Sequence, residues 1–437
     1  MLLLSGCAGL ESVAVRPALP DASVMVAHPG TQHSLQAAAA LAVGGLLDNF
    51  TTRIYYDRRR FPFSWLPDGA VGPIERGLWK RRHKDIPAER VRTIRSWEEV
   101  GLVLLSRAGL PHRLLTPLLA ASQGRFARGA GAGLTPRTRA VVCYSLAALE
   151  TFERAKSLDI TCFLDMAQIH PSTSRRIFEE EARLAPEFAS SIPFIYRSAS
   201  AMERFRRELE LADHVIVASE FARRSLLEQG VESARVSVAP YGVDGQVFHP
   251  GGEPRTCITK FRALFVGSIG QLKGIKYLLD AFRSWAPPDA ELVLCGKMLL
   301  GRELRERYSG VFRHVEYRSH MALSELYRSA DVVVFPSLAD SFGLVVLEAM
   351  ACGVPVIASA NTCALDTIED GSDGFIVPIR DSGALVDRLD RLYRDRGLAR
   401  TMGRAARQKA LRFSWSRYGE CLRAIVRRHA GRREGAF

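Results

Sequence analysis

The chain has 437 residues, of which 47% are hydrophobic and 24% charged, and its formal net charge is +13. This length is too great for one ordinary hydrophobic core, so the chain favours two domains, and the composition excludes extensive disorder. The positive charge favours anionic partners, which include phosphates, nucleic acid and acidic membrane surfaces, without choosing among them.

The first residues and the cysteines bear on the compartment. The first residues, MLLLSGCAG, match the sequence pattern of a lipoprotein cleavage site. However, they lack a basic segment, and their apolar run is shorter than the roughly 7–15 residues of the apolar region of a signal peptide. No stretch approaches the roughly 18 apolar residues of a membrane span. The 8 cysteines include no C-x-x-C pair, which fits a reducing compartment. We expect a cytoplasmic protein, at most peripheral at the inner face of the membrane.

Short apolar strands alternate with helices in the first half of the chain, as in a parallel α/β sheet. Residues 51–138, which are rich in arginine, proline and aromatic residues, have a less regular pattern and are expected to hold helices and an acceptor-facing insertion. The expected strands are Val24–Ala27, Arg139–Cys143, Ile160–Asp165, Asp213–Ala218 and Val236–Val238, and the expected helices lie within Leu35–Leu47, Ala147–Leu158 and Ser219–Glu228.

A proline–glycine break over Ala239–Asp244 predicts a domain boundary between about Asp244 and Thr256. A second alternation follows, and long basic helices begin at Ser382. We therefore expect two Rossmann-like α/β domains over residues 1–245 and 246–400, with helices in 401–437 crossing back to the first domain. The strands expected in the second domain are Ala263–Val266, Glu291–Leu294, Val332–Phe335, Val354–Ala358 and Gly374–Val377.

A glycine-rich turn follows the first strand of the second domain and contains Ser268 and Lys273. A helix is predicted near Gly274, because apolar residues recur at i, i+3, i+4 and i+7 from Ile275. Backbone N–H groups at such a turn favour an anion, and Lys273 adds positive charge. The pattern matches neither a dinucleotide fingerprint nor a P-loop, and alone it equally fits an ordinary turn with a solvated lysine.

The most informative segment is Asp331–Ser359. A buried strand is followed by a loop with Phe342-Gly343 and by a helix over Leu344–Cys352. The N-terminus of this helix would present free N–H groups at the carboxyl edge of the sheet, where open α/β folds bind ligands. Asp340 and Glu348 would accept hydrogen bonds from the hydroxyls of a sugar and a ribose on either side. Taken singly, Asp340 equally fits a helix cap and Glu348 a solvated helix residue.

This segment resembles a known family. The run DSFGLVVLEAMACGVPVIA, from Asp340 to Ala358, resembles the E-x7-E motif of the retaining glycosyltransferases of group 1, which include many bacterial polysaccharide and lipid glycosyltransferases. Ala218–Phe221 and Pro240–Asp244 also resemble this family. The resemblance implies a GT-B fold, in which two Rossmann-like domains face each other across a cleft. It also implies transfer of a sugar from a nucleoside diphosphate sugar with retention of configuration.

The resemblance further implies the roles of the site residues. Glu348 would hold the ribose of the donor, Asp340 the transferred sugar, and Lys273 the charge of the leaving diphosphate. The nucleobase pocket would lie near Tyr317–Met321. The implied donor-binding residues are Ser268, Lys273, Asp340, Phe342, Gly343, Leu344 and Glu348.

Two residues depart from the family pattern. The first acidic residue of the motif is usually glutamate and here is Asp340, so the donor-sugar preference is expected to differ. Ser268 stands where many members have arginine, so stabilisation of the diphosphate would depend more on Lys273, a point charge without bidentate geometry.

The first half of the chain resembles the family less. The segment from His28 through Gly30 to His33 replaces the usual Gly-Gly acceptor loop, which makes these three residues candidates for the acceptor side. His170 lies in a strand-end loop where many members place a histidine near the anomeric carbon, although such a histidine is as readily structural. The candidate catalytic residues are therefore Lys273, Asp340 and His170.

No D-x-D triplet occurs, so we expect neither a metal nor a cofactor, with the nucleoside diphosphate sugar acting as a substrate. The acceptor would be a sugar, a glycan, a lipid-linked acceptor or another small molecule of envelope polysaccharide or glycolipid synthesis. A nucleotide-sugar epimerase of the same architecture is the nearest alternative. A nucleic-acid-binding protein is suggested only by the charge, and no aromatic-interleaved basic motif supports it.

Apolar and cationic residues lie together in the segment 58–82, as a patch for an anionic membrane would require. Buried aromatic side chains beside surface arginines explain this segment equally well. The other basic clusters, including Arg427–Arg433, are scattered along the chain and are expected to be solvated. The residues of the segment are Arg58–Arg60, Phe61, Phe63, Trp65, Leu78, Trp79 and Lys80–Arg82.

Overall fold

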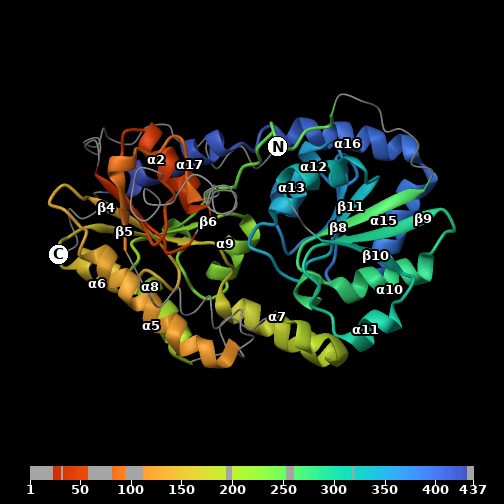
Figure 1. Cartoon of the computed structure of the whole chain (residues 1–437), viewed down its shortest axis with the longest axis horizontal. Coiled ribbons are helices and arrows are strands. Elements are labelled where there is room, and N and C mark those ends of the chain that lie inside the picture. Colours follow the sequence, from red (N-terminus) through yellow and green to blue (C-terminus); the bar gives the residue numbers. More distant parts are fainter. Residues whose placement is uncertain are drawn as a thin grey trace, which may run out of the picture.

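The computed structural model describes residues 23–30, 33–57, 81–94, 112–192, 199–251, 260–316 and 319–430. In these residues the chain forms two parallel sheets, each at the centre of its own α/β domain (Figure 1). The fold class expected from the sequence is therefore confirmed. Of the expected membrane patch, only Arg81 and Arg82 lie among the described residues.

The sheet of the first domain has the order β3-β2-β1-β4-β5-β6-β7, and each neighbouring pair of strands is parallel. Strands β1, β4 and β6 are buried at every position, because their runs of apolar residues are covered by helices on both faces. The strands are β1 Val24–Ala27, β2 Leu47–Thr52, β3 Val91–Thr93, β4 Ala140–Tyr144, β5 Thr161–Met166, β6 His214–Val217 and β7 Val236–Val238.

The helices of the first domain cover both faces of this sheet. Helix α2 packs on one face together with α17, and α5, α6 and α8 lie on the other (Figure 1). These elements are α2 Ser34–Val43, α5 His112–Gly131, α6 Leu149–Lys156, α8 Ala199–Leu211, α9 Glu220–Leu227 and the short 3-10 helices Ala88–Arg90 and Ser233–Arg235.

The sheet of the second domain has the order β10-β9-β8-β11-β12-β13 and is also parallel. Its strands are β8 Phe261–Val266, β9 Ala290–Cys295, β10 Phe312–Val315, β11 Val332–Phe335, β12 Val356–Ser359 and β13 Gly374–Val377. Its helices are α10 Ile275–Trp285, α11 Arg302–Arg307, α12 His320–Arg328, α13 Leu344–Ala351, α14 Ala364–Thr367, α15 Ser382–Arg394 and α16 Arg396–Ala410, with η6 Gln271–Lys273 before α10.

Two segments cross between the domains. Helix α7, Pro171–Leu184, and the 3-10 helix η4, Pro186–Ser191, follow a strand of the first domain. However, Phe188 lies in the core of the second domain and its ring contacts Tyr308 with 6.1 Å between the centroids. The 3-10 helix η4 therefore packs on the second domain, whereas Ile177 and Phe178 of α7 lie in the core of the first domain and Arg176 pairs with Glu228 at 3.7 Å.

The last described helix crosses in the opposite direction. Helix α17, Trp415–His429, packs against α2 of the first domain, where the guanidinium of Arg423 donates to the carbonyl of Ala40 at 3.0 Å. Helix α16 stays on the second domain: a Cβ added to Gly403 would lie 2.1 Å from the carbonyl oxygen of Gly353, after α13. The crossing thus lies after Ala410, later than the expected start at residue 401.

Candidate functional site

Two loops meet at the carboxyl edge of the second sheet. One follows β8 and carries Lys273, and the other follows β11 and carries Asp340. Gly274 adopts a φ of +68°, and a Cβ at this position would lie 2.0 Å from the carbonyl oxygen of Pro336. The backbone N–H of Leu338 donates to the carbonyl of Leu272 at 3.2 Å. The close approach that glycine permits therefore holds the two loops together.

The side chains of Lys273 and Asp340 form an ion pair at this junction, and each is 18% exposed. The ammonium of Lys273 also lies 5.4 Å from the centroid of the Phe335 ring. The second carboxylate oxygen of Asp340 accepts from the backbone N–H of Phe342 at 3.3 Å. Each charge thus neutralises the other where the two loops meet.

Helix α13 begins directly beside this ion pair. Its N-cap is Gly343, with φ +90° and no side-chain cap, and a Cβ there would lie 2.7 Å from the Phe335 ring. Only glycine fits such a position without strain. The N–H of Val346 donates to the carbonyl of Gly343 at 2.9 Å. The N–H groups of Gly343 and Leu344 have no side-chain cap, and with the helix dipole they favour an anion.

Glu348 lies one turn further along α13 and is half-buried. One of its carboxylate oxygens accepts from the hydroxyl of Tyr327 on α12 at 2.8 Å. Burial raises the pKa of Glu348 to about 7, although the hydrogen bond from Tyr327 opposes this shift. Tyr327 is completely buried and was not identified from the sequence, because nothing in its local pattern distinguishes it from a core residue.

The remaining donor-side candidates lie around these groups. Ser268 is exposed in the loop after β8, and Phe342 is buried behind the start of α13. Of the expected nucleobase pocket, Tyr317 and Arg318 lie outside the described residues. A cavity of about 580 Å³ between the end of β10 and α12 adjoins this segment, with Glu316 and Ala322 in its lining.

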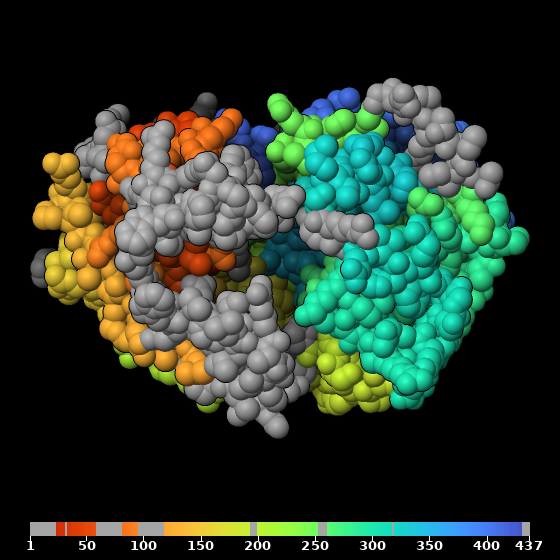
Figure 2. Space-filling model, in the orientation of Figure 1, coloured from red at the N-terminus to blue at the C-terminus, as the bar shows by residue number. Residues whose placement is uncertain are grey.

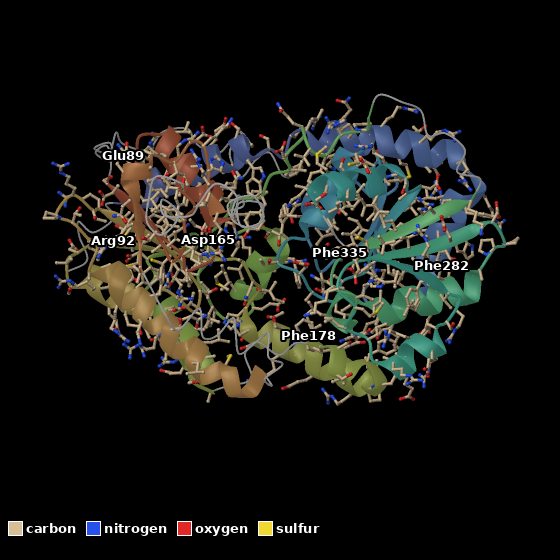
Figure 3. All side chains as sticks on the ribbon, in the orientation of Figure 1. Glu89, Arg92, Asp165, Phe178, Phe282 and Phe335 are labelled. Atoms are coloured by element: carbon tan, nitrogen blue, oxygen red, sulfur yellow. The ribbon has the colours of Figure 1, made fainter. Side chains whose placement is uncertain are left out.

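On the first-domain side, His33 pairs with Asp165, an aspartate that the sequence did not single out. The Nε2 of His33 lies 2.9 Å from a carboxylate oxygen of Asp165, and the two side chains are 5% and 3% exposed. The hydroxyl of Tyr241, in the interdomain linker, lies 3.3 Å from the same nitrogen. The ring of Tyr241 contacts that of Phe342, with 5.1 Å between centroids. Figure 3 shows Asp165 and Phe335 on opposite sides of the space between the two sheets.

His28 and Gly30 form a turn beside this pair. The backbone N–H of Gly30 donates to Nδ1 of His28 at 3.0 Å, and the edge of the His28 ring contacts Tyr144 at 4.6 Å between centroids. Burial lowers the pKa of His28 to about 4, so this ring is neutral at physiological pH. The structure therefore brings His28, Gly30 and His33 together at one edge of the first sheet.

His170 has the contacts of a capping residue. Its Nδ1 accepts from the backbone N–H of Ser172 at 3.2 Å, at the N-terminus of α7, and its ring contacts Phe205. Burial lowers the pKa of His170 to about 4. These contacts hold the ring in the fold, and none of those described joins it to Lys273 or Asp340.

The loop that carries Asp340 docks on the first domain. The hydroxyl of Ser219 donates to the carbonyl of Ser341 at 2.6 Å, and the hydroxyl of Ser341 donates to the carbonyl of Ala167 at 2.7 Å. The site thus lies where the domains touch, beside the recess that Figure 2 shows between them.

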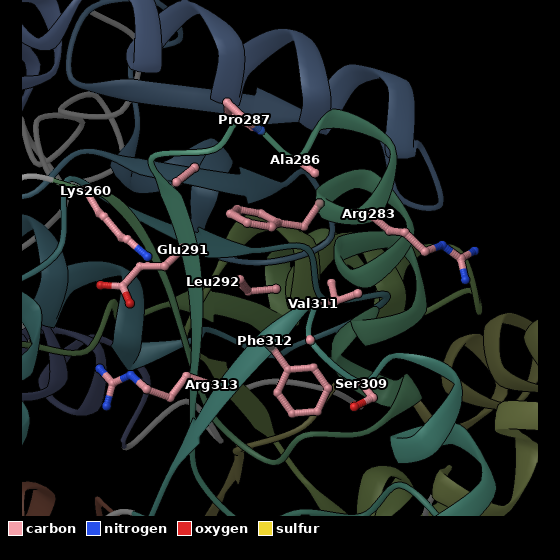
Figure 4. A pocket seen from close by; sticks show the side chains of 13 residues that line it. Lys260, Arg283, Ala286, Pro287, Glu291, Leu292, Ser309, Val311, Phe312 and Arg313 are labelled. Atoms are coloured by element: carbon pink, nitrogen blue, oxygen red, sulfur yellow. The ribbon is translucent and has the colours of Figure 1, made fainter.

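A second cavity of about 570 Å³ lies at the other end of the second sheet (Figure 4). Lys260, Glu291 and Arg313 line it, at the start of β8, β9 and β10, and Glu291 is paired with Arg262 at 2.6 Å. Open α/β sheets bind ligands at the carboxyl ends of their strands. We therefore assign the site to the loops around Lys273 and Asp340.

Within the part of the chain that the structure describes, no helix is both long enough and apolar enough to span a bilayer. In the same residues, no three histidine, cysteine or acidic side chains gather as a metal site would require.

Comparison with known proteins connects this site to a family. Residues 258–409 match the family model described as "Glycosyl transferases group 1". A D-inositol 3-phosphate glycosyltransferase from Paenarthrobacter aurescens is 35% identical over 205 residues, which cover 43% of this chain and 50% of the relative. One from Mycobacterium bovis is 33% identical over 249 residues, which cover 50% of this chain and 49% of the relative. The chain thus spans about half the length of these relatives.

Solved structures resemble both domains at low sequence identity. Sucrose-phosphate synthase from Thermosynechococcus elongatus has a TM-score of 0.62 at 19% identity, covering 93% of this chain and 98% of its own. Anabaena Alr3699/HepE, solved with UDP-glucose, has a TM-score of 0.60 at 17% identity and covers 92% of this chain and 99% of its own. These likenesses concern the fold, which is that of the GT-B glycosyltransferases.

Proposed function

Because residues 258–409 form a domain of the glycosyl transferases group 1 family, we propose that the chain is a glycosyltransferase that uses a nucleoside diphosphate sugar as its donor. The observation that carries the proposal is the ion pair of Lys273 with Asp340 beside the uncapped N-terminus of α13. This arrangement places a cation, a carboxylate and free N–H groups at one point, which suits the junction between a diphosphate and a sugar.

In this proposal the donor replaces the ion pair. The diphosphate accepts from the N–H groups of Gly343 and Leu344 and from the ammonium of Lys273. Asp340, released from Lys273, accepts from hydroxyls of the transferred sugar. Glu348 accepts from the ribose, while Tyr327 holds its other oxygen in place. Binding thus replaces one ion pair by several charge-assisted hydrogen bonds.

The chemical step requires stabilisation of the charge that develops on the leaving diphosphate. Lys273 and the N-terminus of α13 are already in place for this charge, and preorganised groups of this kind usually supply the largest catalytic contribution. We propose that the acceptor hydroxyl attacks from the face that the diphosphate leaves. The bond from the anomeric carbon to the phosphate breaks, a phosphate oxygen takes the acceptor proton, and configuration is retained.

The acceptor would enter from the first-domain side of the recess, where His28, Gly30 and His33 lie. We propose a sugar, a glycan or a lipid-linked molecule of envelope polysaccharide or glycolipid synthesis as the acceptor. His170 is not included, because its contacts are those of a helix cap.

Substitution of Lys273 and Glu348 tests the site. Lys273→Ala and Glu348→Ala should each abolish sugar transfer and donor hydrolysis, measured by release of the nucleoside diphosphate. Lys276→Ala is the matched control, because Lys276 lies three residues further on and pairs with Asp280 within α10 at 2.5 Å. The control should retain normal turnover. Near-native turnover of Lys273→Ala would refute the assignment of the site.

A donor screen tests the substrate class. Thermal shifts with a panel of uridine, guanosine and adenosine diphosphate sugars should identify one base and sugar that stabilise the chain. Incubation of that donor without acceptor separates a transferase from an epimerase-like enzyme, because only an epimerase converts the sugar of the intact donor.

A further inference from the structure

Most of the net charge of the chain lies on its last two described helices. Residues 396–430, which span α16 and α17, contain ten lysines and arginines but one acidic residue, Glu420. These residues therefore hold a net charge of +9 of the +13 of the whole chain. The positive charge is thus concentrated in the long basic helices that were expected from Ser382 onward, and two of its cations, Arg396 and Lys409, are paired with Asp331 and Asp373 of the second domain.

Two of the four arginines of α16, Arg400 and Arg404, lie on its outer face. Arg396 pairs with Asp331, and Arg407 donates to the carbonyls of Phe248 and Ala351 on the inner face. The buried side of this helix, with Ala399, Met402 and Ala406, packs on the second domain. Arg400, Arg404 and Leu411 are exposed at i, i+4 and i+11 and so share one outer stripe. Arg412 is exposed directly beyond the helix.

Helix α17 is arranged in the same way. Tyr418, Leu422 and Val426 are buried against the first domain, and Arg417 and Arg427 are exposed on the opposite side. Arg417 is paired with Glu420 at 2.8 Å. Figure 1 shows α16 along one edge of the second domain, and α17 continues from it to α2 of the first domain. Exposed arginines therefore occur along both helices, from the second domain to the first.

Aliphatic side chains are exposed among these cations. Leu411, between the two helices, is 51% exposed. Val43, at the end of α2, is 68% exposed, and it precedes Gly44, which lies against the side chain of Arg423 on α17. Arginines around exposed aliphatic residues are the combination that binds the interface of an anionic bilayer.

We propose that this C-terminal basic surface, formed by Arg400, Arg404, Leu411, Arg412, Arg427 and Val43, binds the surface of a membrane that contains anionic phospholipid. Single-stranded nucleic acid is the weaker fit, because its bases stack on exposed aromatic rings. On the described part of this surface the one tryptophan, Trp415, is half-buried. The partner is thus a lipid surface, which would hold the enzyme beside a lipid-linked acceptor. The binding itself does not depend on the proposed transferase activity.

Vesicle flotation with the full chain tests this proposal without any donor. Vesicles of phosphatidylcholine with phosphatidylglycerol should bind the protein at low salt, vesicles of phosphatidylcholine alone should not, and binding should weaken as salt increases. Each arginine near such a surface contributes about fivefold to partitioning, so Arg400→Glu with Arg404→Glu should weaken binding by about 25-fold or more. Leu411→Ser should reduce the binding that persists at high salt.

The matched control reverses the charge of two arginines on another helix. Arg302 and Arg305 lie on α11, near the edge of the second domain opposite α16 (Figure 1), so Arg302→Glu with Arg305→Glu changes the net charge equally. This variant should bind vesicles like the unmodified chain. Three results would each overturn the proposal. They are an equal loss of vesicle binding in both double variants, no binding of the unmodified chain to anionic vesicles, and tighter binding to a single-stranded oligonucleotide than to vesicles. Normal donor turnover of the α16 variant with soluble acceptors would show that the two functions are separate.

Discussion

At the residue scale, Glu348 should make donor binding depend on pH. Its pKa is raised to about 7 by burial, so the group is a carboxylate above this pH and becomes protonated below it. A protonated acid loses acceptor capacity for the ribose hydroxyls. Donor affinity should therefore fall as the pH decreases through about 7, by about tenfold per unit if only the carboxylate binds.

Calorimetric titration of the donor at several pH values measures this effect, and Glu348→Gln should bind weakly at every pH. The pH dependence of stability has the opposite sign to that of donor affinity. Because the folded pKa lies above the ordinary value of 4.5, the free enzyme should lose stability as the pH rises from about 4.5 to about 7. Donor affinity that is constant between pH 6 and 8 would contradict the role given to Glu348.

Gly274 and Gly310 provide a second test at the residue scale. Both have positive φ, but a Cβ on Gly274 would lie 2.0 Å from the carbonyl oxygen of Pro336, whereas Gly310 has open space around it. Alanine at Gly310 should cost about 1–2 kcal/mol of stability from backbone strain alone. Alanine at Gly274 should cost clearly more and should also weaken donor binding, because it separates the loops that hold Lys273 and Asp340. Urea unfolding measures the loss of stability in the two variants, and donor titration measures the loss of affinity. Equal losses of stability would refute the close packing of Gly274 against Pro336.

The sequence identifies those site residues whose roles follow from a local pattern. Asp340, Gly343 and Glu348 lie within nine residues of one another on a strand, loop and helix that the pattern predicts. Tyr327 and Asp165 could not be found in this way. The local pattern identifies Asp165 only as the end of a buried strand, and its partner His33 is 132 residues away.

At the scale of elements, Glu208 on α8 holds the start of α6. Its carboxylate is fully buried and accepts from the backbone N–H groups of Leu146, Ala148 and Leu149 at 2.6–3.1 Å. Glu208→Ala would leave these donors unsatisfied and also remove one of the two acidic partners of Arg204, the other being Glu150. We expect a loss of about 3–5 kcal/mol of unfolding free energy.

Chemical denaturation measures this loss. Glu203→Ala is the control on the same helix, because Glu203 is exposed and pairs only with Arg206 among the contacts described. It should change the stability by about 0.5 kcal/mol or less. A similarly small effect of Glu208→Ala would show that α6 is positioned by its apolar contacts instead.

The elements that the sequence predicts are those with a distinctive local pattern. Strands β1, β7, β11 and β13 have the expected bounds: β1, β11 and β13 are short apolar runs followed by turn residues, and β7 precedes the proline–glycine break. Strands β2, β3 and β10 were missed. Their sequences, LDNFTT, VRT and FRHV, mix polar and apolar residues because β3 and β10 are edge strands and β2 lies next to one. Their strand conformation comes from pairing with a neighbour, which a local pattern does not reveal.

At the scale of the whole molecule, each half of the chain contributes a segment to the other domain. Phe188 of η4 and Glu181 near the end of α7 contact the second domain, and α17 packs on the first. The contacts that fix α7 join residues far apart, such as Glu181 with Arg380, 199 positions later. The local pattern of neighbouring residues therefore does not reveal that α7 reaches the second domain.

These reciprocal crossings should make the two domains unfold together. Neither domain is complete without a segment from the other half of the chain, so partial unfolding would expose the surface that Phe188 or α17 covers. We expect a single transition in scanning calorimetry, with equal calorimetric and van't Hoff enthalpies. Two separated transitions in the unmodified chain would contradict this expectation.

Glu181 is the residue on which this coupling should depend most. It is fully buried on α7 and accepts from the hydroxyl of Tyr277 at 2.9 Å and from the guanidinium of Arg380 at 2.7 Å. Glu181→Ala would leave Arg380 without this buried partner, at a cost of about 3–5 kcal/mol. Its neighbour Glu180 pairs with the same arginine at 2.8 Å but is 47% exposed, so Glu180→Ala should cost about 1 kcal/mol or less. If the melting temperature falls equally in both variants, the buried contact does not couple the domains. If it falls only in Glu181→Ala, the crossing of α7 is what joins the two sheets into one folding unit.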